Sequence, residues 1–112
     1  MKIAVRKLER VVVLDLEGML NQGDPANSFL ATVHRHLHSG VKNLAINMAA
    51  VPTIDSSGVG TLLRAHSVAV ESGARLILFA LTEPVRKSLI RVRLDTVIAQ
   101  VADEASALAS FG

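Results

Sequence analysis

Residues 44–60 read LAINMAAVPTIDSSGVG and contain the transition that decides how the chain folds. The apolar run Leu44–Met48 is typical of a short buried strand, and Ala49–Asp55 is interpreted as a loop. A helix is expected from about Ser57 to Glu71, with Gly73 beyond its end. A strand, a polar loop and a helix in this order indicate one unit of an α/β domain.

Upstream of this stretch, the pattern predicts a hairpin. Two apolar runs rich in β-branched residues, Ile3–Leu8 and Val11–Leu16, are separated by Glu9 and Arg10. The second run does not alternate between apolar and polar residues. It is therefore expected in the middle of a sheet that is covered on both faces.

Helix-capping residues, prolines and glycines predict the remaining helices and strands. Asp24 is expected to cap the first helix with Pro25 at its first position, Gly40 to end it, and Asp103 to cap the last helix. Beyond Gly73 we expect a strand Arg75–Ala80, a helix opened by Thr82-Glu83-Pro84, a strand Val97–Val101 and a helix Glu104–Phe111.

The first three helices carry apolar stripes that are expected to face the sheet. Predicted inward-facing residues are Phe29, Leu30, Val33 and Leu37 in the first, Val59, Leu62, Leu63, His66 and Val70 in the second, and Val85, Leu89 and Val92 in the third. The order β-β-α-β-α-β-α-β-α predicts a single α/β domain over residues 1–112, with a mostly parallel sheet, an N-terminal hairpin and about four helices. In such sheets, function lies at the carboxyl ends of the strands.

Composition narrows the class of protein. The 112 residues suffice for one domain, and a hydrophobic share of 50% with 20% charged residues is globular. The absence of cysteine excludes disulfides and thiolate metal sites. Three Phe, no Trp or Tyr and a net charge of +2 argue against nucleic-acid binding by base stacking. With no apolar run of about 18 residues and a charged start, we expect a cytoplasmic protein without membrane insertion.

The loop before the second helix carries the strongest functional signal. Asp55, Ser56 and Ser57 offer three helix caps where one suffices, and Gly58 and Gly60 each cost about 1 kcal/mol of helix stability relative to Ala. Two interpretations stay open: simple capping with glycines that permit close packing, or a backbone left open for a partner. A phosphate on Ser56 or Ser57 would lie in the favourable field of a helix N-terminus.

Enzymatic interpretations fail on spacing. The serines lack a Gly-x-Ser-x-Gly elbow, and Gly58-Val59-Gly60 is not part of a nucleotide-binding motif. All four histidines fall inside predicted helices, where His34 and His38 share a face beside Arg35 without a nearby carboxylate. We therefore expect no catalytic residue, no metal and no cofactor.

Around Asp55–Gly60 the chain resembles the STAS domain, the module shared by sulphate transporters and bacterial anti-sigma factor antagonists. The resemblance covers the whole chain in its length, opening hairpin and element order. It also includes the Gly18-Met19-Leu20 turn, Val85-x-x-x-Leu89 in the third helix and Leu94-Asp95-x-Val97 before the last strand.

The resemblance implies a protein-binding switch and not an enzyme. Such antagonists bind an anti-sigma factor that is also a serine kinase, and so regulate transcription. The kinase phosphorylates the serine after the motif's aspartate, which matches Ser56, with Ser57 the lesser candidate, and a serine phosphatase reverses this. The alternative is a STAS scaffold subunit, in a stress-signalling or lipid-transport assembly, whose serine is never modified.

The chain departs from the family pattern at Asn21 and Asn47, where members often have Asp. Both positions are expected near the phosphorylation site. The loss of two negative charges there changes the choice of kinase or leaves Ser56 unmodified.

The partner is expected to dock on the outward face of the second helix and on the loop beside it. Ser57, Thr61, Arg64 and Val68 recur at helical spacing opposite the Val59-Leu62-Leu63 stripe. The basic residues Arg86, Lys87, Arg91 and Arg93 of the third helix are expected to be solvated, where they could meet an acidic partner. The predicted partner-binding residues are Asn21, Asp24, Asp55, Ser56, Ser57, Gly60, Thr61 and Arg64, on a monomer or weak dimer.

Overall fold

The computed structural model describes residues 1–21 and 23–111. Its elements follow the predicted order, with one short 3₁₀ helix added before the last strand. They are β1 (Lys2–Lys7), β2 (Val12–Glu17), α1 (Asp24–His38), β3 (Asn43–Ala50), α2 (Ser56–Glu71), β4 (Arg75–Phe79), α3 (Glu83–Arg91), η1 (Leu94–Thr96), β5 (Ala99–Val101) and α4 (Glu104–Ser110). The predicted fold class is confirmed.

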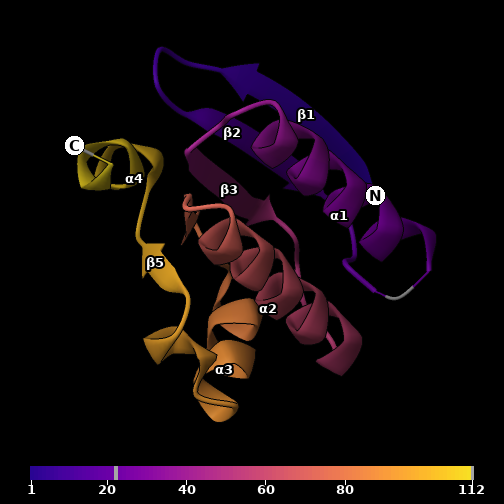
Figure 1. Cartoon of the computed structure of the whole chain (residues 1–112). Helices are drawn as coiled ribbons and strands as arrows, with labels where there is room; N and C mark the ends of the chain where they lie inside the picture. The colour runs from indigo at the N-terminus through magenta and orange to yellow at the C-terminus, as the bar shows by residue number, and fades with distance from the viewer. Residues whose placement is uncertain (22, 112) are drawn as a thin grey trace.

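The strands form one sheet in the order β1-β2-β3-β4-β5 (Figure 1). β1 pairs antiparallel with β2 through the register Lys7↔Val12, which confirms the predicted hairpin. The pairs β2–β3, β3–β4 and β4–β5 are parallel. The carboxyl ends of β2 and β3 therefore lie at the same edge of the sheet, where the chain enters α1 and α2.

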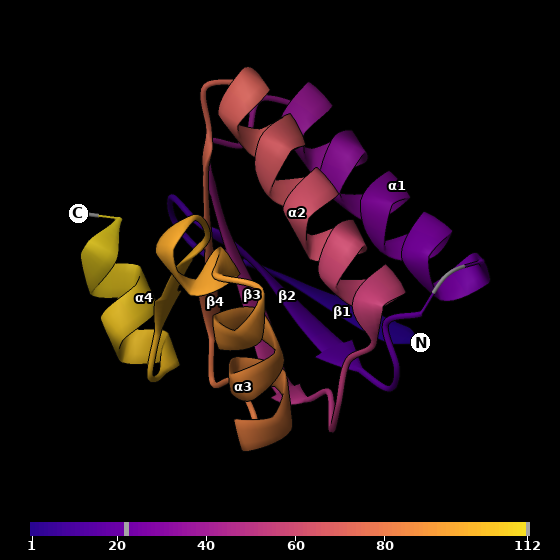
Figure 2. The same ribbon diagram turned by 90° about the horizontal axis from the view of Figure 1, so that it is seen from below.

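Helices cover both faces of the sheet (Figure 2). Val12, Leu14 and Leu16 of β2 face the larger core, which α1, α2 and α3 close. On the other face, Val13 belongs to a smaller cluster closed by Ala107 of α4. The prediction that the non-alternating run Val11–Leu16 lies in a sheet covered on both faces is confirmed.

The buried face of α2 differs from the predicted one. Four of its five buried residues are small, and the fifth is a leucine: Gly58, Thr61, Leu62, Ala65 and Ala69. Leu63 and Val70 are instead 37% and 59% exposed. Small side chains let the helix backbone approach α1 and the sheet closely, so the larger apolar residues lie at the margin of the contact. Only Leu62 of the predicted stripe is fully buried.

Three other expectations are wrong in detail. Gly23, with a φ of 89°, is the N-cap of α1, so Asp24 is the first helical residue and not the cap. Arg93 adopts a left-handed φ of 62° beyond α3, and this turn leaves Val92 outside the helix and 53% exposed. Val97 precedes the three-residue strand β5 and is 48% exposed, although the pattern places it in the strand.

Candidate functional site

The predicted motif lies where β3 ends and α2 begins, and buried residues hold this loop in place. Val51 is fully buried and Ile54 is 6% exposed. The Thr82 hydroxyl, at the N-terminus of α3, donates to the carbonyl oxygens of Val51 at 2.9 Å and Pro52 at 3.3 Å. This role of Thr82 leaves no local sequence signal, because the contact with Val51 spans 31 residues. The loop thus enters α2 from a position fixed by α3.

Asp55 caps α2. Its Oδ1 accepts hydrogen bonds from the Gly58 backbone N–H at 2.8 Å and from the Ser57 hydroxyl at 2.7 Å. The Gly58 N–H and, next in importance, the Ser57 hydroxyl hold the pKa of the Asp55 carboxyl below its usual value. Of the three predicted capping residues, Asp55 makes the cap.

The two serines occupy different environments. The Ser57 hydroxyl donates to Asp55, and its side chain is partly buried. Ser56 is the first residue of α2 and is exposed. In the part of the chain that the structure describes, its hydroxyl has no hydrogen-bond partner. Ser56 therefore presents an accessible nucleophilic oxygen at a helix N-terminus.

The two glycines of the motif, Gly58 and Gly60, have different structural surroundings. A Cβ at Gly58 would lie 2.2 Å from the Leu20 carbonyl oxygen and 2.5 Å from Cγ1 of Ile54, so close packing requires glycine there. A Cβ at Gly60 would meet no atom within 4 Å. The open-backbone interpretation fits only Gly60, whereas Gly58 joins α2 to the turn after β2.

That turn brings the predicted Asn21–Asp24 loop beside α2. The Gly18 N–H donates to the Ala50 carbonyl oxygen at 3.0 Å, and Leu20 is buried in the core next to Gly58. Asn21 and Asp24 are exposed on this loop, while Gln22 lies outside the described residues. The turn and the motif thus form one continuous edge.

Further along α2, Arg64 is exposed but Thr61 is not. Thr61 is 3% exposed, and its hydroxyl donates to the Ser57 carbonyl oxygen at 2.9 Å. The prediction that Thr61 lies on the outward face is wrong, because the small-residue stripe turns this position toward the core. Val68 is likewise partly buried against the core.

Asn47 does not belong to the edge formed by the turn and the motif. Its side-chain N–H donates to Asp15 Oδ1 at 2.8 Å, and its Oδ1 accepts the Ala49 N–H at 3.0 Å. Alternation along β3 directs Asn47 toward the α4 side of the sheet, whereas Ile46 and Met48 face α2. The expectation that Asn47 lies near the phosphorylation site is therefore not met.

Asp15 belongs to a charged network on that side. The Arg6 guanidinium donates to both Asp15 oxygens, at 2.6 and 2.9 Å, and to Glu104 at 2.6 and 3.2 Å. The hydrogen bond from Arg6 lowers the pKa of Asp15. This network ties β1 and β2 to α4.

A cleft of about 420 Å³ lies beside the motif, between the loop residues Thr53 and Ile54 and the exposed face of α3. Lys87 and Arg91, one helical turn apart, line it. The exposed basic side of α3 is confirmed, and Arg86 pairs with Glu83 there. The cleft itself is a tertiary feature that the sequence pattern does not reveal.

The described residues contain no group of three or more His, Cys, Asp or Glu side chains that could hold a metal ion. His34 and His38 are exposed on α1, whereas His36 is buried and its Nδ1 lies 2.8 Å from the Thr32 carbonyl oxygen. Within residues 1–21 and 23–111, every helix is too short or too polar to cross a bilayer.

The fold and the motif together define a STAS domain. The family model for the STAS domain matches residues 2–107, and the chain belongs to this family. No curated protein sequence matches the chain.

Solved structures with a similar fold include anti-sigma factor antagonists. A candidate antagonist from Thermotoga maritima is 22% identical with a TM-score of 0.88, over 96% of this chain and 92% of that one. A variant of RsbS from Moorella thermoacetica is 20% identical with a TM-score of 0.81, over 98% and 94%. The phosphorylated form of SpoIIAA, a Bacillus cell fate determinant, is 22% identical with a TM-score of 0.75, over 99% and 100%. At these identities the likeness shows the fold.

Proposed function

We propose that this STAS domain is an anti-sigma factor antagonist that acts by binding and not by catalysis. In this proposal it sequesters an anti-sigma factor that is also a serine kinase, and phosphorylation of Ser56 ends the binding. The observation that carries the proposal is the exposed Ser56 hydroxyl at the first position of α2. A serine phosphatase would restore the binding form.

The contacts of the motif support Ser56 over Ser57 as the modified residue. A kinase needs an accessible hydroxyl, and the Ser57 hydroxyl is already bound to the cap carboxylate at 2.7 Å. A phosphate on Ser56 adds about −1.5 to −2 charges at a helix end that favours anions. The folded state would tolerate this charge, while a desolvated partner surface would not.

The proposed docking surface consists of the exposed and partly exposed residues around the start of α2. Asp55 and Ser56 form its centre, and Gly60 leaves room for close approach of a partner backbone. Thr61 is omitted because it is buried. The full set is Asn21, Asp24, Asp55, Ser56, Ser57, Gly60 and Arg64.

The test is phosphopeptide mass spectrometry of the protein from its native cells, with a pull-down before and after phosphatase treatment. We expect a phosphate on Ser56 and a partner kinase captured preferentially after phosphatase treatment. A phosphate found only at other residues would contradict the assignment. Partner capture without phosphate on Ser56 under any growth condition would instead support the unmodified scaffold subunit.

A further inference from the structure

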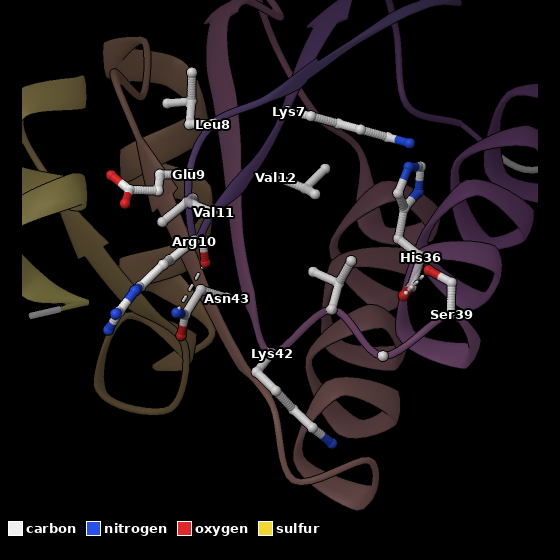
Figure 3. Close-up of a pocket in the computed structure, with 12 residues that line it drawn as sticks. Lys7, Leu8, Glu9, Arg10, Val11, Val12, His36, Ser39, Lys42 and Asn43 are labelled. Carbon is white, nitrogen blue, oxygen red and sulfur yellow. Dashed lines mark hydrogen bonds between the residues drawn. The ribbon is translucent and has the colours of Figure 1, made fainter.

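A second hollow lies at the opposite edge of the sheet, where β2 and β3 begin. The cleft has a volume of about 470 Å³, within the range of small-molecule sites. Its walls are the hairpin turn between β1 and β2, the end of α1 and the segment that leads into β3 (Figure 3). Because Ser56 follows the carboxyl end of β3, this cleft is separate from the proposed switch.

One wall carries a buried histidine with a single ring nitrogen available. His36 is 7% exposed, and its Nδ1 lies 2.8 Å from the Thr32 carbonyl oxygen. A carbonyl oxygen only accepts, so this contact requires a proton on Nδ1, and Nε2 is the ring nitrogen left for a ligand. The contact gives His36 a structural role on α1. The histidines of the His34–His38 run have no part in the proposed switch at Ser56.

A lysine faces this histidine across the cleft. Figure 3 shows the Lys7 side chain pointing toward His36. Within residues 1–21 and 23–111, the Lys7 ammonium has no hydrogen-bond or ion-pair partner. Lys42, which also lines the cleft, instead donates to the Ser72 carbonyl oxygen at 2.8 Å. Lys7 is therefore the cation that is available to an anionic group beside His36.

The rest of the lining combines aliphatic residues with polar and charged ones. Val12 is 6% exposed and forms part of the sheet, whereas Leu8 on the hairpin turn is 39% exposed. Among the described residues that line the cleft there is no Phe, Tyr or Trp, so the imidazole of His36 is its one aromatic ring. Its charged side chains are Lys7, Arg10 and Lys42, against one carboxylate, Glu9. These features favour a ligand with an aliphatic body and a negative group.

We propose that this cleft binds a small amphipathic anion, a phosphate monoester or carboxylate that carries a short aliphatic chain. An anionic oxygen of the ligand accepts from the Lys7 ammonium, and an O–H of a phosphate monoester donates to His36 Nε2. The chain covers Leu8, which is 39% exposed. A free metabolite and a lipid headgroup share this chemistry.

The test is a titration of the ¹⁵N-labelled full chain with octyl phosphate and with octanoate, followed by NMR. Octyltrimethylammonium serves as the probe of opposite charge, and phosphatidylcholine vesicles with phosphatidic acid represent a lipid surface. We expect saturable shifts in residues 7–12 and 36–43, with binding about tenfold weaker in Lys7→Gln. Lys2→Gln is the matched control, because Lys2 is an exposed lysine at the other end of the same strand.

The outcomes separate the possibilities. If octyl phosphate binds saturably and Lys7→Gln weakens this binding, the proposal is supported and the ligand is a free molecule. If the chain binds the vesicles and Lys7→Gln weakens that binding, the proposal is supported and the ligand is a lipid headgroup. Equal shifts with octyltrimethylammonium would overturn the proposal. So would an absence of saturable shifts in these residues, or equal affinity in Lys7→Gln and the wild type. None of these results depends on phosphorylation of Ser56.

Discussion

Ser56 and Ser57 are the same side chain one residue apart, and their surroundings give them different chemistry. The Ser57 hydroxyl completes the cap by donating to Asp55. Ser56 is exposed at the first position of α2, where its hydroxyl reaches solvent. The proposed phosphate on Ser56 would therefore leave the hydrogen bonds of the Asp55 cap intact.

A negative charge at Ser56 is expected to preserve the fold and remove the partner. In Ser56→Asp the carboxylate lies at a helix N-terminus, so the melting temperature hardly changes. In the interface the same charge loses its water, and a cost of about 2–3 kcal/mol weakens binding about 30- to 150-fold. Calorimetric titration with the captured partner and a thermal melt measure both effects.

Ser56→Ala is the control for this prediction and is expected to keep both the fold and the binding. If Ser56→Asp binds as tightly as the wild type, the switch is refuted and the scaffold interpretation takes its place. Unfolding of Ser56→Asp would contradict the exposed position of this side chain.

The two motif glycines are expected to respond to alanine in opposite directions. Gly58→Ala places Cβ 2.2 Å from a backbone oxygen, so we expect a loss of about 1–3 kcal/mol in the free energy of unfolding. Gly60→Ala meets open space and improves helix propensity, so we expect a gain of up to about 1 kcal/mol. Urea unfolding of both variants measures the difference, and equal effects would contradict the packing role of Gly58.

Within α2, the cap at one end and the small-residue stripe along the helix determine how the proposed binding residues are exposed. Asp55 fixes the first turn through the Gly58 N–H. Gly58, Ala65 and Ala69 then bring the helix close to its neighbours, which turns Thr61 inward and leaves Arg64 outside. The residues available to the proposed docking surface thus depend on which side of α2 packs against the core.

The cap predicts a pH dependence of stability. The pKa of Asp55 is lowered in the folded state, so its contribution is present above about pH 4, the usual range of aspartate, and is lost as the pH falls through the folded pKa. Asp55→Asn keeps a capping side chain without this titration. Thermal melts between about pH 5 and about pH 3 should therefore show a smaller loss in Asp55→Asn than in the wild type.

Asp24→Asn is the control for the cap, because the α1 N-terminus has no side-chain cap hydrogen bond. If the melting temperature falls equally in the wild type and in Asp55→Asn as the pH is lowered, the Asp55 cap does not contribute to the pH dependence of stability. The remaining carboxylates are common to both proteins, so the difference isolates Asp55.

Arg64 tests the docking face. It lies two helical turns after Ser56 and is exposed, so Arg64→Glu reverses a charge without disturbing the core. We expect about tenfold weaker partner binding, measured by calorimetric titration, with an unchanged melting temperature. Arg35→Glu, an exposed change on α1, is the control and should bind as the wild type does. Full binding in Arg64→Glu would place the interface elsewhere.

Across the domain, Arg6 joins elements that are far apart in the chain. It contacts Asp15, nine residues away, and Glu104, 98 residues away, and so connects the hairpin to α4. α4 also packs through the buried Ala107, and Arg75 of β4 donates to the Ser110 carbonyl oxygen at 2.8 Å. The Arg6 ion pair therefore holds the start of α4, while the Ala107 contact and the Arg75 hydrogen bond hold the rest of the helix.

Replacement of Arg6 is expected to loosen this connection. Arg6→Gln removes both ion pairs, and because the Arg6 side chain is 39% exposed we expect only about 1 kcal/mol of lost stability. Thermal melts check the global effect, and amide hydrogen exchange should show faster exchange in α4. Arg86→Gln, which removes a local pair with Glu83 one turn away, is the control. Unchanged exchange in α4 would contradict the role of Arg6.

Much of the fold could be predicted from local pattern, but the surface of the site could not. The hairpin and the element order follow from apolar runs and capping residues close together in the chain, whereas the structure was needed to select Asp55 among three candidate caps. Two predictions were wrong: that Thr61 faces outward, and that Asn47 lies near the proposed phosphorylation site. Both properties depend on how the helices pack on the sheet, which local pattern does not specify. The rule that large apolar residues mark the buried face failed on α2, where close approach favours small ones.

The amino-acid order by itself determined an α/β domain with Ser56 after a capped helix start, because capping and strand burial depend on neighbouring residues. Only the tertiary structure decided which face of α2 is buried and that residue 58 must be glycine. Those properties rest on the Leu20 carbonyl and on Ile54, which reach Gly58 only after the loops have packed. The residues around Gly58 in sequence do not specify where the turn with Leu20 will lie, so local pattern cannot predict this packing constraint on residue 58.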